Sequence, residues 1–224
     1  MIGIRIPIKC PKKVITYFVL ERGYHMQQDN TLAYYNSHAT AFYQNTVTAD
    51  LTTTQTLFLS KLKKGSYILD FGCGSGRDTK YFLEQGFRVD AVDGSTELCK
   101  LASEHAGIQV KKMFFQELSE VNRYDGIWAC SSILHLQANE LAAVMGKMAI
   151  ALKNNGILYT SFKYGTYSGE RNGRYFTDMT EDTFMAFLLE NRMDNLKIEE
   201  QWVTNDVRPG RGEEKWLNLI LRKS

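Results

Sequence analysis

The sequence predicts an α/β domain with a seven-stranded, mostly parallel sheet, an antiparallel last strand, helices on both faces and an N-terminal helical cap. Apolar strand-like runs alternate with helical stretches from residue 67 to about 162, which is typical of a parallel sheet. The first run leads into a glycine-rich turn at 72–76, followed by a helical stretch. A chain of 224 residues, 44% apolar and 23% charged, has the length and composition of one globular domain.

Residues 1–25 are interpreted separately from a domain at 26–224. Three lysines, Lys9, Lys12 and Lys13, precede an apolar run at 14–20 that is too short to span a bilayer and has no small-residue cleavage site after it. Codons for Glu21-Arg22-Gly23 can spell a ribosome-binding sequence shortly before Met26. Two readings stay open: residues 1–25 are a translated leader, or they are a genuine extension.

The elements follow in order. Two helices at 31–45 and 50–63 form the expected cap. Strands are expected at 67–71, 87–92, 108–115, 124–130 and 157–162, with helices after Gly76, at 95–105 and at 139–152. A helix at 180–192 precedes two strands, 196–203 and 215–221, whose short connection favours an antiparallel hairpin.

The turn after the first strand indicates a cofactor site, because glycines at a strand-to-helix turn let a ligand approach the backbone. The dinucleotide form of this turn needs a further glycine where the chain has Arg77, so the pattern favours a nucleoside without a pyrophosphate. Asp93 ends the second strand about 20 residues later, the place of an acid that accepts hydrogen bonds from ribose hydroxyls. The alternative for Asp93 is a cap for the helix beginning near Ser95.

Four segments extend this pattern. They are Ile68-Leu69-Asp70-Phe71-Gly72-Cys73-Gly74-Ser75-Gly76-Arg77-Asp78, Val92-Asp93-Gly94-Ser95, Tyr124-Asp125-Gly126-Ile127-Trp128-Ala129-Cys130 and Ser161-Phe162-Lys163. With them the chain resembles the Rossmann-like class I S-adenosylmethionine-dependent methyltransferases over 31–223, and within them a small bacterial subgroup labelled tellurite-resistance-type.

The resemblance implies S-adenosylmethionine as cofactor and assigns its contacts. Asp70 and the glycine turn surround the methionine part, Asp93 holds the ribose, and the ends of the third and fourth strands flank the adenine. A family Asp near the adenine is replaced here by Phe115-Gln116-Glu117, which puts adenine recognition in doubt. The expected cofactor residues are Asp70, Gly72, Cys73, Gly74, Gly76, Asp93, Gly94, Phe115, Gln116, Glu117, Ala129, Cys130 and Ser131.

The substrate-side residues follow the fourth and fifth strands, whose carboxyl ends face the ligand in such sheets. His135 is a candidate general base, with a packing histidine as its alternative. Lys163, Arg174 and Tyr175 form a basic, aromatic segment that either binds an anionic acceptor or is a solvated loop. Tyr35 on the cap either covers the cofactor or packs ordinarily.

Charge and cysteine content limit the partners. A net charge of +2 without a basic cluster predicts neither a nucleic-acid nor a membrane partner, and four scattered cysteines predict no metal site and a cytoplasmic setting. The predicted activity is methyl transfer to a small-molecule acceptor. The alternatives are a nicotinamide-dependent oxidoreductase and a non-catalytic S-adenosylmethionine-binding module. Neither the acceptor nor the oligomeric state is indicated.

Overall fold

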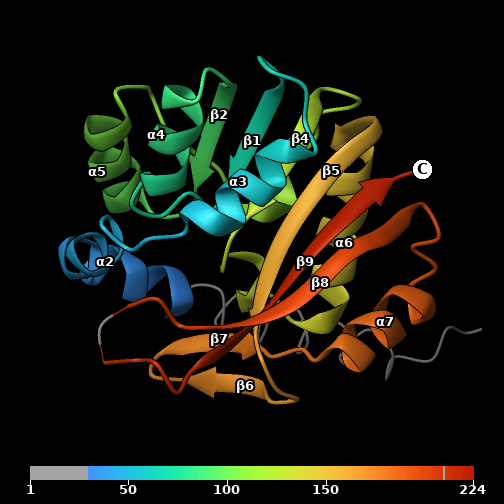
Figure 1. Cartoon of the computed structure of the whole chain (residues 1–224). Coiled ribbons are helices and arrows are strands. Elements are labelled where there is room, and N and C mark those ends of the chain that lie inside the picture. The colour runs from blue at the N-terminus through green and yellow to red at the C-terminus, as the bar shows by residue number, and fades with distance from the viewer. Residues whose placement is uncertain (1–29, 209) are drawn as a thin grey trace, which may run out of the picture.

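Seven strands form one sheet in the order β3-β2-β1-β4-β5-β9-β8 in the computed structural model, which describes residues 30–208 and 210–224 (Figure 1). Five strands pair in parallel: β1 (Tyr67–Phe71), β2 (Arg88–Asp93), β3 (Lys111–Lys112), β4 (Tyr124–Ala129) and β5 (Leu152–Lys163). The last strand, β9 (Lys215–Lys223), lies antiparallel between β5 and β8 (Leu196–Asn205). The predicted fold class and the late hairpin are therefore confirmed.

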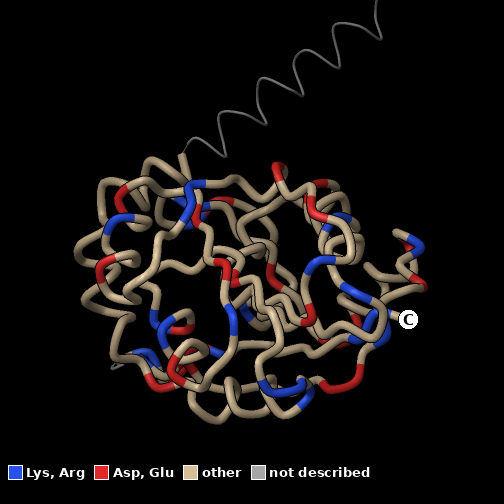
Figure 2. The backbone as a smooth tube through the Cα atoms, turned by 90° about the horizontal axis from the view of Figure 1, so that it is seen from above, with Lys and Arg blue, Asp and Glu red and all other residues tan. Residues whose placement is uncertain are grey.

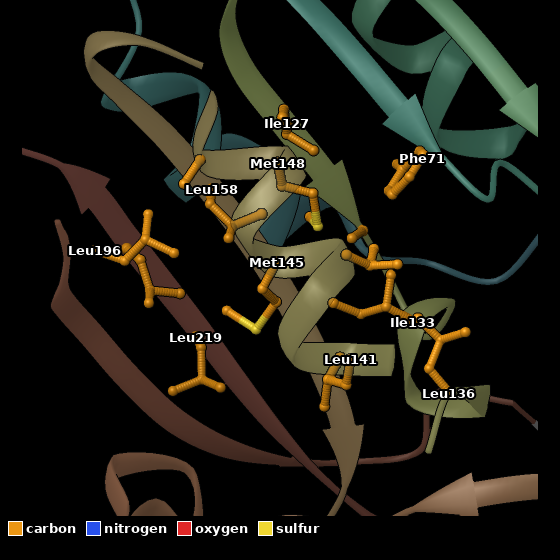
Figure 3. Close-up of a cluster of buried hydrophobic side chains, with 14 of the residues drawn as sticks. Phe71, Ile127, Ile133, Leu136, Leu141, Met145, Met148, Leu158, Leu196 and Leu219 are labelled. Carbon is orange, nitrogen blue, oxygen red and sulfur yellow. The ribbon is translucent and has the colours of Figure 1, made fainter. Parts of the chain in front are cut away.

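Helices cover both faces of this sheet, because the side chains of each strand alternate between two cores. Ile68 packs with Phe58 of α3 (Thr52–Ser60) and Phe82 of α4 (Arg77–Glu84). The next residue, Leu69, faces the other core, which contains α6 (Ala138–Ala151) and α7 (Glu181–Glu190). Figure 3 shows Met145 of α6 in that second core. Alternation in the strand sequences thus fixes which helices lie on which face.

The N-terminal cap differs from the prediction in its helix ends. The expected helix at 31–45 is interrupted at His38, giving a helix at 30–37 followed by α2 (Ala39–Thr46). The Ser37 hydroxyl donates to the carbonyl of Ala33 at 2.8 Å, a local bond that competes with regular helical geometry. The expected helix at 50–63 is the shorter α3.

The third strand is also shorter than predicted, with two residues instead of eight. Lys111 and Lys112 alone pair with β2. On one side Val110 N donates to the Ser103 hydroxyl of α5 (Thr96–Ala106), and on the other the chain turns into a 3-10 helix, η1 (Phe115–Glu117). Because β3 is an edge strand, bonds to a neighbouring helix replace the missing sheet bonds.

The segment after β5, predicted as a basic, aromatic segment, is a hairpin. β6 (Ser168–Arg171) pairs antiparallel with β7 (Arg174–Thr177). Asn172 and Gly173 connect them with φ of +50° and +74°, the left-handed conformation that an Asn-Gly hairpin turn needs. β5 itself begins at Leu152, five residues before the predicted start.

Residues 1–25, interpreted from the sequence as either a translated leader or a genuine extension, lie outside the described residues. Within the described part of the chain, no helix is long and apolar enough to cross a membrane. Basic and acidic residues are interspersed along the backbone (Figure 2).

Candidate active site

A pocket opens at the carboxyl ends of the parallel strands, around the point where the strand order changes direction between β1 and β4. One wall, here called the glycine-turn side, includes 72–75, Arg77, Asp78, Asp93, Gly94, Leu98 and 113–115. The opposite wall, the hairpin side, includes Lys163, Arg174, Phe176, 204–208, Arg211 and Trp216. Thr31, Leu32 and Tyr35 of the helix at 30–37 also line the pocket, as do 130–132 and 134–136 after β4.

The glycine turn needs glycine for its own packing as well as for ligand access. Gly72 has φ +83°, and a Cβ there would lie 2.5 Å from the Cβ of Ser132. Gly76 has φ +76°, and its Cβ would lie 3.0 Å from the backbone of Ala102 on α5. A side chain at either position is therefore excluded by conformation and by close neighbours.

Asp93 supports the turn from the end of β2. One carboxylate oxygen accepts from Gly74 N at 2.9 Å and the other from Ser95 N at 2.8 Å. Burial raises the pKa of this carboxyl, while the backbone donors act to lower it. The Asp93 carboxylate lines the pocket, and each of its oxygens has a second lone pair for an incoming hydroxyl.

A buried charged network lies directly behind the turn. Asp78 accepts from Arg77 Nε at 2.7 Å, from Trp128 Nε1 at 2.8 Å and from Gln55 Nε2 at 2.7 Å. Burial acts to raise the pKa of Asp78, but the Arg77 guanidinium and these hydrogen bonds hold it below its usual value. The network therefore ties α4 to β4 and α3.

Asp70 occupies a different place from the one implied by the resemblance. Its side chain is 2% exposed, accepts from the Thr79 hydroxyl at 2.5 Å and does not line the pocket. Burial, and then the neighbouring Asp78 charge, raise the pKa of Asp70 to about 8. This carboxyl supports the turn from beneath rather than from the cavity.

Three consecutive apolar residues, Met113, Phe114 and Phe115, form the far end of the glycine-turn side. The following two side chains are directed elsewhere. The Gln116 amide donates to the Glu140 carboxylate at 2.5 Å, and the Glu117 carboxylate accepts from Phe114 N at 2.7 Å. This end of the pocket therefore offers apolar and aromatic side chains to a ligand, and its polar groups are those of the backbone.

The end of β4 adds a strained residue to the pocket. Ser131 has φ +52°, and its N–H donates to the Ser161 hydroxyl at 2.9 Å. Cys130 lines the pocket beside it, whereas Ala129 is fully buried in the sheet. Burial raises the pKa of the Cys130 thiol to about 11, so this group remains protonated at neutral pH.

Tyr35 and His135 form a pair across the mouth of the pocket. The His135 Nδ1 lies 2.6 Å from the carbonyl oxygen of Tyr175, which can only accept, so Nδ1 carries the ring proton. Nε2 then accepts from the Tyr35 hydroxyl at 2.8 Å. Burial, helped by the charge of Arg174, lowers the pKa of His135 to about 4, so the ring is neutral.

The hairpin side carries most of the pocket's cations. Lys163 pairs with Glu214, and Arg208 pairs with Asp206, which also accepts from Trp216 Nε1 at 3.1 Å. The Arg174 guanidinium lies 4.4 Å from the ring centroid of Tyr34.

The pocket brings together most of the predicted site residues. Those that line it are Tyr35, Gly72, Cys73, Gly74, Asp93, Gly94, Phe115, Cys130, Ser131, His135, Lys163 and Arg174. Those that do not line it are Asp70, Gly76, Gln116, Glu117, Ala129 and Tyr175. Tyr175 acts through its backbone carbonyl on His135.

Two groups of lining residues were missed from the sequence. The first is the β8–β9 connection, with Asp206, Arg208 and Arg211. The second is the apolar floor formed by Leu98, Met113 and Phe114. The Asn172-Gly173 pair was an available signal for the hairpin, whereas no local pattern marks the β8–β9 connection. Among the described residues, no group of three or more His, Cys, Asp or Glu side chains is arranged to hold a metal ion.

Comparison with known proteins finds similarity to methyltransferases. Residues 68–156 match a family model described as a methyltransferase domain. N-terminal Xaa-Pro-Lys N-methyltransferase 1 of Xenopus tropicalis is 37% identical over 100 residues, 41% of this chain and 45% of that protein. The chain thus spans less than half the length of this curated relative.

Two solved structures resemble the whole domain. Burkholderia thailandensis 1,6-didemethyltoxoflavin-N1-methyltransferase, with bound 1,6-didemethyltoxoflavin and S-adenosylhomocysteine, has a TM-score of 0.66 at 21% identity, covering 99% of this chain and 93% of that one. A TehB-like S-adenosylmethionine-dependent methyltransferase of Corynebacterium glutamicum has a TM-score of 0.61 at 18% identity, covering 84% of this chain and 99% of that one.

The sheet order, the antiparallel last strand and the glycine turn at the first strand define a Rossmann-like fold, and the two solved methyltransferase structures share this fold.

Proposed function

We propose that this chain transfers a methyl group from S-adenosylmethionine to a small-molecule acceptor. One observation carries the proposal: a single pocket joins the glycine turn and Asp93 to a separate basic and aromatic wall. The first wall suits a nucleoside cofactor, and the second leaves space for another molecule beside it. The S-adenosylhomocysteine and the 1,6-didemethyltoxoflavin bound to the Burkholderia thailandensis enzyme support the same assignment.

The residues of the glycine-turn side fit S-adenosylmethionine by their chemistry. Asp93 offers carboxylate lone pairs to the ribose hydroxyls, and the apolar wall of Met113, Phe114 and Phe115 suits the faces of an adenine. The backbone of 72–75 lies where the methionine part would extend, and Asp70 supports that backbone from below. Gln116 and Glu117 enter this assignment through their backbone, because their side chains bond elsewhere.

When bound, this cofactor supplies a methyl group already activated by a sulfonium. The protein then has to align the acceptor with the methyl carbon and exclude water. Thr31, Leu32 and Tyr35 bring the helix at 30–37 over the pocket, and Asn36 anchors that helix by accepting from the Ser95 hydroxyl at 2.8 Å. This helix is the proposed cover of the site.

Orientation of the acceptor is assigned to Tyr35, with His135 as the residue that positions the Tyr35 hydroxyl. The neutral His135 ring accepts a hydrogen bond from that hydroxyl, which leaves the phenolic oxygen turned as an acceptor toward an N–H or O–H of the substrate. Because the pKa of His135 is lowered to about 4 and both its nitrogens are occupied, the ring acts through Tyr35.

The Tyr35 assignment is tested with the variants Tyr35→Phe and His135→Gln. Each is expected to bind S-adenosylmethionine as the parent does, yet to transfer methyl about 10²-fold more slowly in single-turnover measurements. The exposed variant Tyr167→Phe, on the loop before β6, is the control. Transfer at the parent rate in both variants would remove the pair from the reaction.

A protein N-terminus is the second candidate acceptor, because N-terminal Xaa-Pro-Lys N-methyltransferase 1 is among the similar proteins. The hairpin side argues against it. Lys163, Arg174 and Arg211 line that wall, and a Xaa-Pro-Lys terminus brings an ammonium and a lysine of the same sign. Peptides of that sequence and small anions are therefore offered side by side in the acceptor screen.

Tellurite and selenite belong in the same screen, since the proposed subgroup carries the tellurite-resistance label and a TehB-like protein shares the fold. The proposed setting is the cytoplasm, consistent with the free thiols of Cys73, Cys99 and Cys130.

Cofactor titration comes first in testing the function. Calorimetry with S-adenosylhomocysteine, NAD and NADP separates the methyltransferase from an oxidoreductase, and S-adenosylhomocysteine alone is expected to bind. Labelled S-adenosylmethionine incubated with the protein and a cell extract then reports turnover. If S-adenosylhomocysteine binds but no labelled product forms, the protein is a non-catalytic binding module. Binding of NAD in place of S-adenosylhomocysteine would refute the proposal.

A further inference from the structure

The cations of the hairpin side differ in how their charge is balanced. Lys163 and Arg211 both pair with Glu214, the latter at 3.5 Å, and Arg208 pairs with Asp206. Arg174 is the exception among the pocket-lining cations of the described chain, since it has no carboxylate within ion-pair distance. A guanidinium without a counter-ion in a pocket wall is unusual, because partial burial of an unpaired charge is costly.

Aromatic rings hold the Arg174 guanidinium in place. Its Cζ lies 4.4 Å from the ring centroid of Tyr34, 5.2 Å from that of Phe176 and 5.7 Å from that of Tyr35. Cation–π contacts of this kind fix the plane of the group without neutralising it. Within the described residues, its side chain makes a single long hydrogen bond, 3.5 Å from Nη1 to the Tyr35 hydroxyl, and its buried Nε has no partner there.

Two further cations near Arg174, Arg171 and Lys163, are each paired with a carboxylate. Arg174, Arg171 and Lys163 all act in the same direction on the ionisation of His135, disfavouring its protonated form. Arg171 itself pairs with Asp178 outside the pocket lining. The hairpin side therefore presents a preorganised, uncompensated cation beside the Tyr35 hydroxyl.

We propose that Arg174 binds a carboxylate or phosphate group of the methyl acceptor, which makes the acceptor a small organic anion. This inference rests on the proposed function and adds the chemical class of its substrate. Planar anions suit the site best, because the guanidinium fork offers parallel N–H donors and the surrounding aromatic rings accept a flat apolar body.

The cofactor's own carboxylate is the other possible source of an anion. The methionine part is assigned to the glycine turn, whereas Arg174 belongs to β7 on the opposite wall. The acceptor is therefore the favoured partner of Arg174, and the two sources give different results in the following test.

The test uses the full chain saturated with S-adenosylhomocysteine and titrates it with a panel of small probes. Benzoate, phenyl phosphate and acetate are the anions, and benzamide is the neutral counterpart of benzoate. The parent is expected to prefer benzoate to benzamide. Arg174→Gln is expected to weaken benzoate binding about tenfold or more and to leave benzamide unchanged, because a charge-assisted bond to a partly desolvated anion is lost.

Two further variants control for charge and folding. Lys100→Gln removes a positive charge from an exposed pair on α5, with side chains 62% and 48% exposed, and is expected to bind every probe like the parent. Arg174→Lys keeps the charge and is expected to retain part of the preference. Circular dichroism and thermal denaturation establish that each variant is folded.

The outcomes are separable. Absence of anion binding to the parent, or an unchanged preference in Arg174→Gln, overturns the proposal. A loss of affinity for S-adenosylhomocysteine in Arg174→Gln, with 5′-methylthioadenosine unaffected, assigns Arg174 to the cofactor's carboxylate and also overturns it. Failure of S-adenosylhomocysteine to bind the parent refutes the proposed function, whereas the benzoate and benzamide titrations still report on Arg174.

Discussion

The two walls of the pocket hold their charges in different ways. On the glycine-turn side, the Asp93 carboxylate accepts two backbone N–H groups, and Asp78 is buried among Arg77, Trp128 and Gln55. On the hairpin side, the charges belong to long side chains, and the Lys163–Glu214 pair remains 18% and 37% exposed. The first wall is fixed by the backbone of the sheet, whereas the second depends on side chains of later segments.

This difference matches what each wall has to recognise. A cofactor is constant, so backbone groups and buried carboxylates can be fixed for it with little loss of freedom on binding. An acceptor is specific to one enzyme, and loops or hairpins on a rigid scaffold are where such specificity is usually found.

The largest effect is expected for the buried carboxylate behind the glycine turn. Asp78→Ala leaves Arg77, Trp128 and Gln55 without their acceptor and is expected to lower the free energy of unfolding by about 3–5 kcal/mol. Glu214→Gln, on the hairpin side, is expected to cost less than about 1 kcal/mol because its pair is solvated. Urea denaturation measures both, and equal losses would contradict the contrast.

A pH effect is expected from His135 between the two walls. Its pKa falls from 6.5 to about 4 on folding, so the unfolded chain binds the proton more readily. The stability it contributes is complete above pH 6.5 and is lost as the pH falls from 6.5 toward 4, by about 2–3 kcal/mol. As the pH is lowered from 6.5 toward 4, the free energy of unfolding of His135→Gln should fall less steeply than that of the parent. Parallel profiles would refute the lowered pKa of His135. Contributions common to both proteins, such as that of Asp70, cancel in this comparison.

A loss of cofactor affinity is expected when the proposed ribose acceptor is removed. Asp93→Ala is expected to weaken S-adenosylmethionine binding by about 1–3 kcal/mol, because hydroxyl partners are left desolvated. Calorimetry measures the loss, with the exposed Asp194→Ala as a charge-matched control. Unchanged affinity in a folded Asp93→Ala protein would remove this carboxylate from the site.

The smallest effect concerns the strained residue at the end of β4. Ser131→Gly is expected to raise the free energy of unfolding by about 0.5–1 kcal/mol, since glycine adopts φ +52° without a Cβ penalty. The adjacent Ser132→Gly is expected to lose stability, because the Ser132 hydroxyl donates to the Phe71 carbonyl at 2.7 Å. Thermal denaturation of the two variants should therefore shift in opposite directions, and a destabilised Ser131→Gly protein would contradict the strain argument.

The sequence alone determined the parts of the molecule that depend on local chemistry. Alternation of strands and helices defined the sheet, and the late pair of strands its antiparallel edge. The glycine turn and Asp93 could be predicted because a short local sequence pattern specifies a tight strand-to-helix turn and a carboxylate at a strand end. Helix and strand ends were less well predicted, as at His38 and β3, because neighbouring elements supply the bonds that decide them.

Only the tertiary structure decided how the hairpin side is assembled. Tyr35 meets His135 across 100 positions, Arg174 reaches Tyr34 and Tyr35 from β7, and the β8–β9 connection completes the wall with Arg208. Among the residues at 30–208 and 210–224, it also separated Lys163 and Arg208, which pair with carboxylates, from Arg174, which does not. These contacting residues come from segments that are far apart in the chain. Their long side chains extend in directions that the local periodicity of the sequence does not predict.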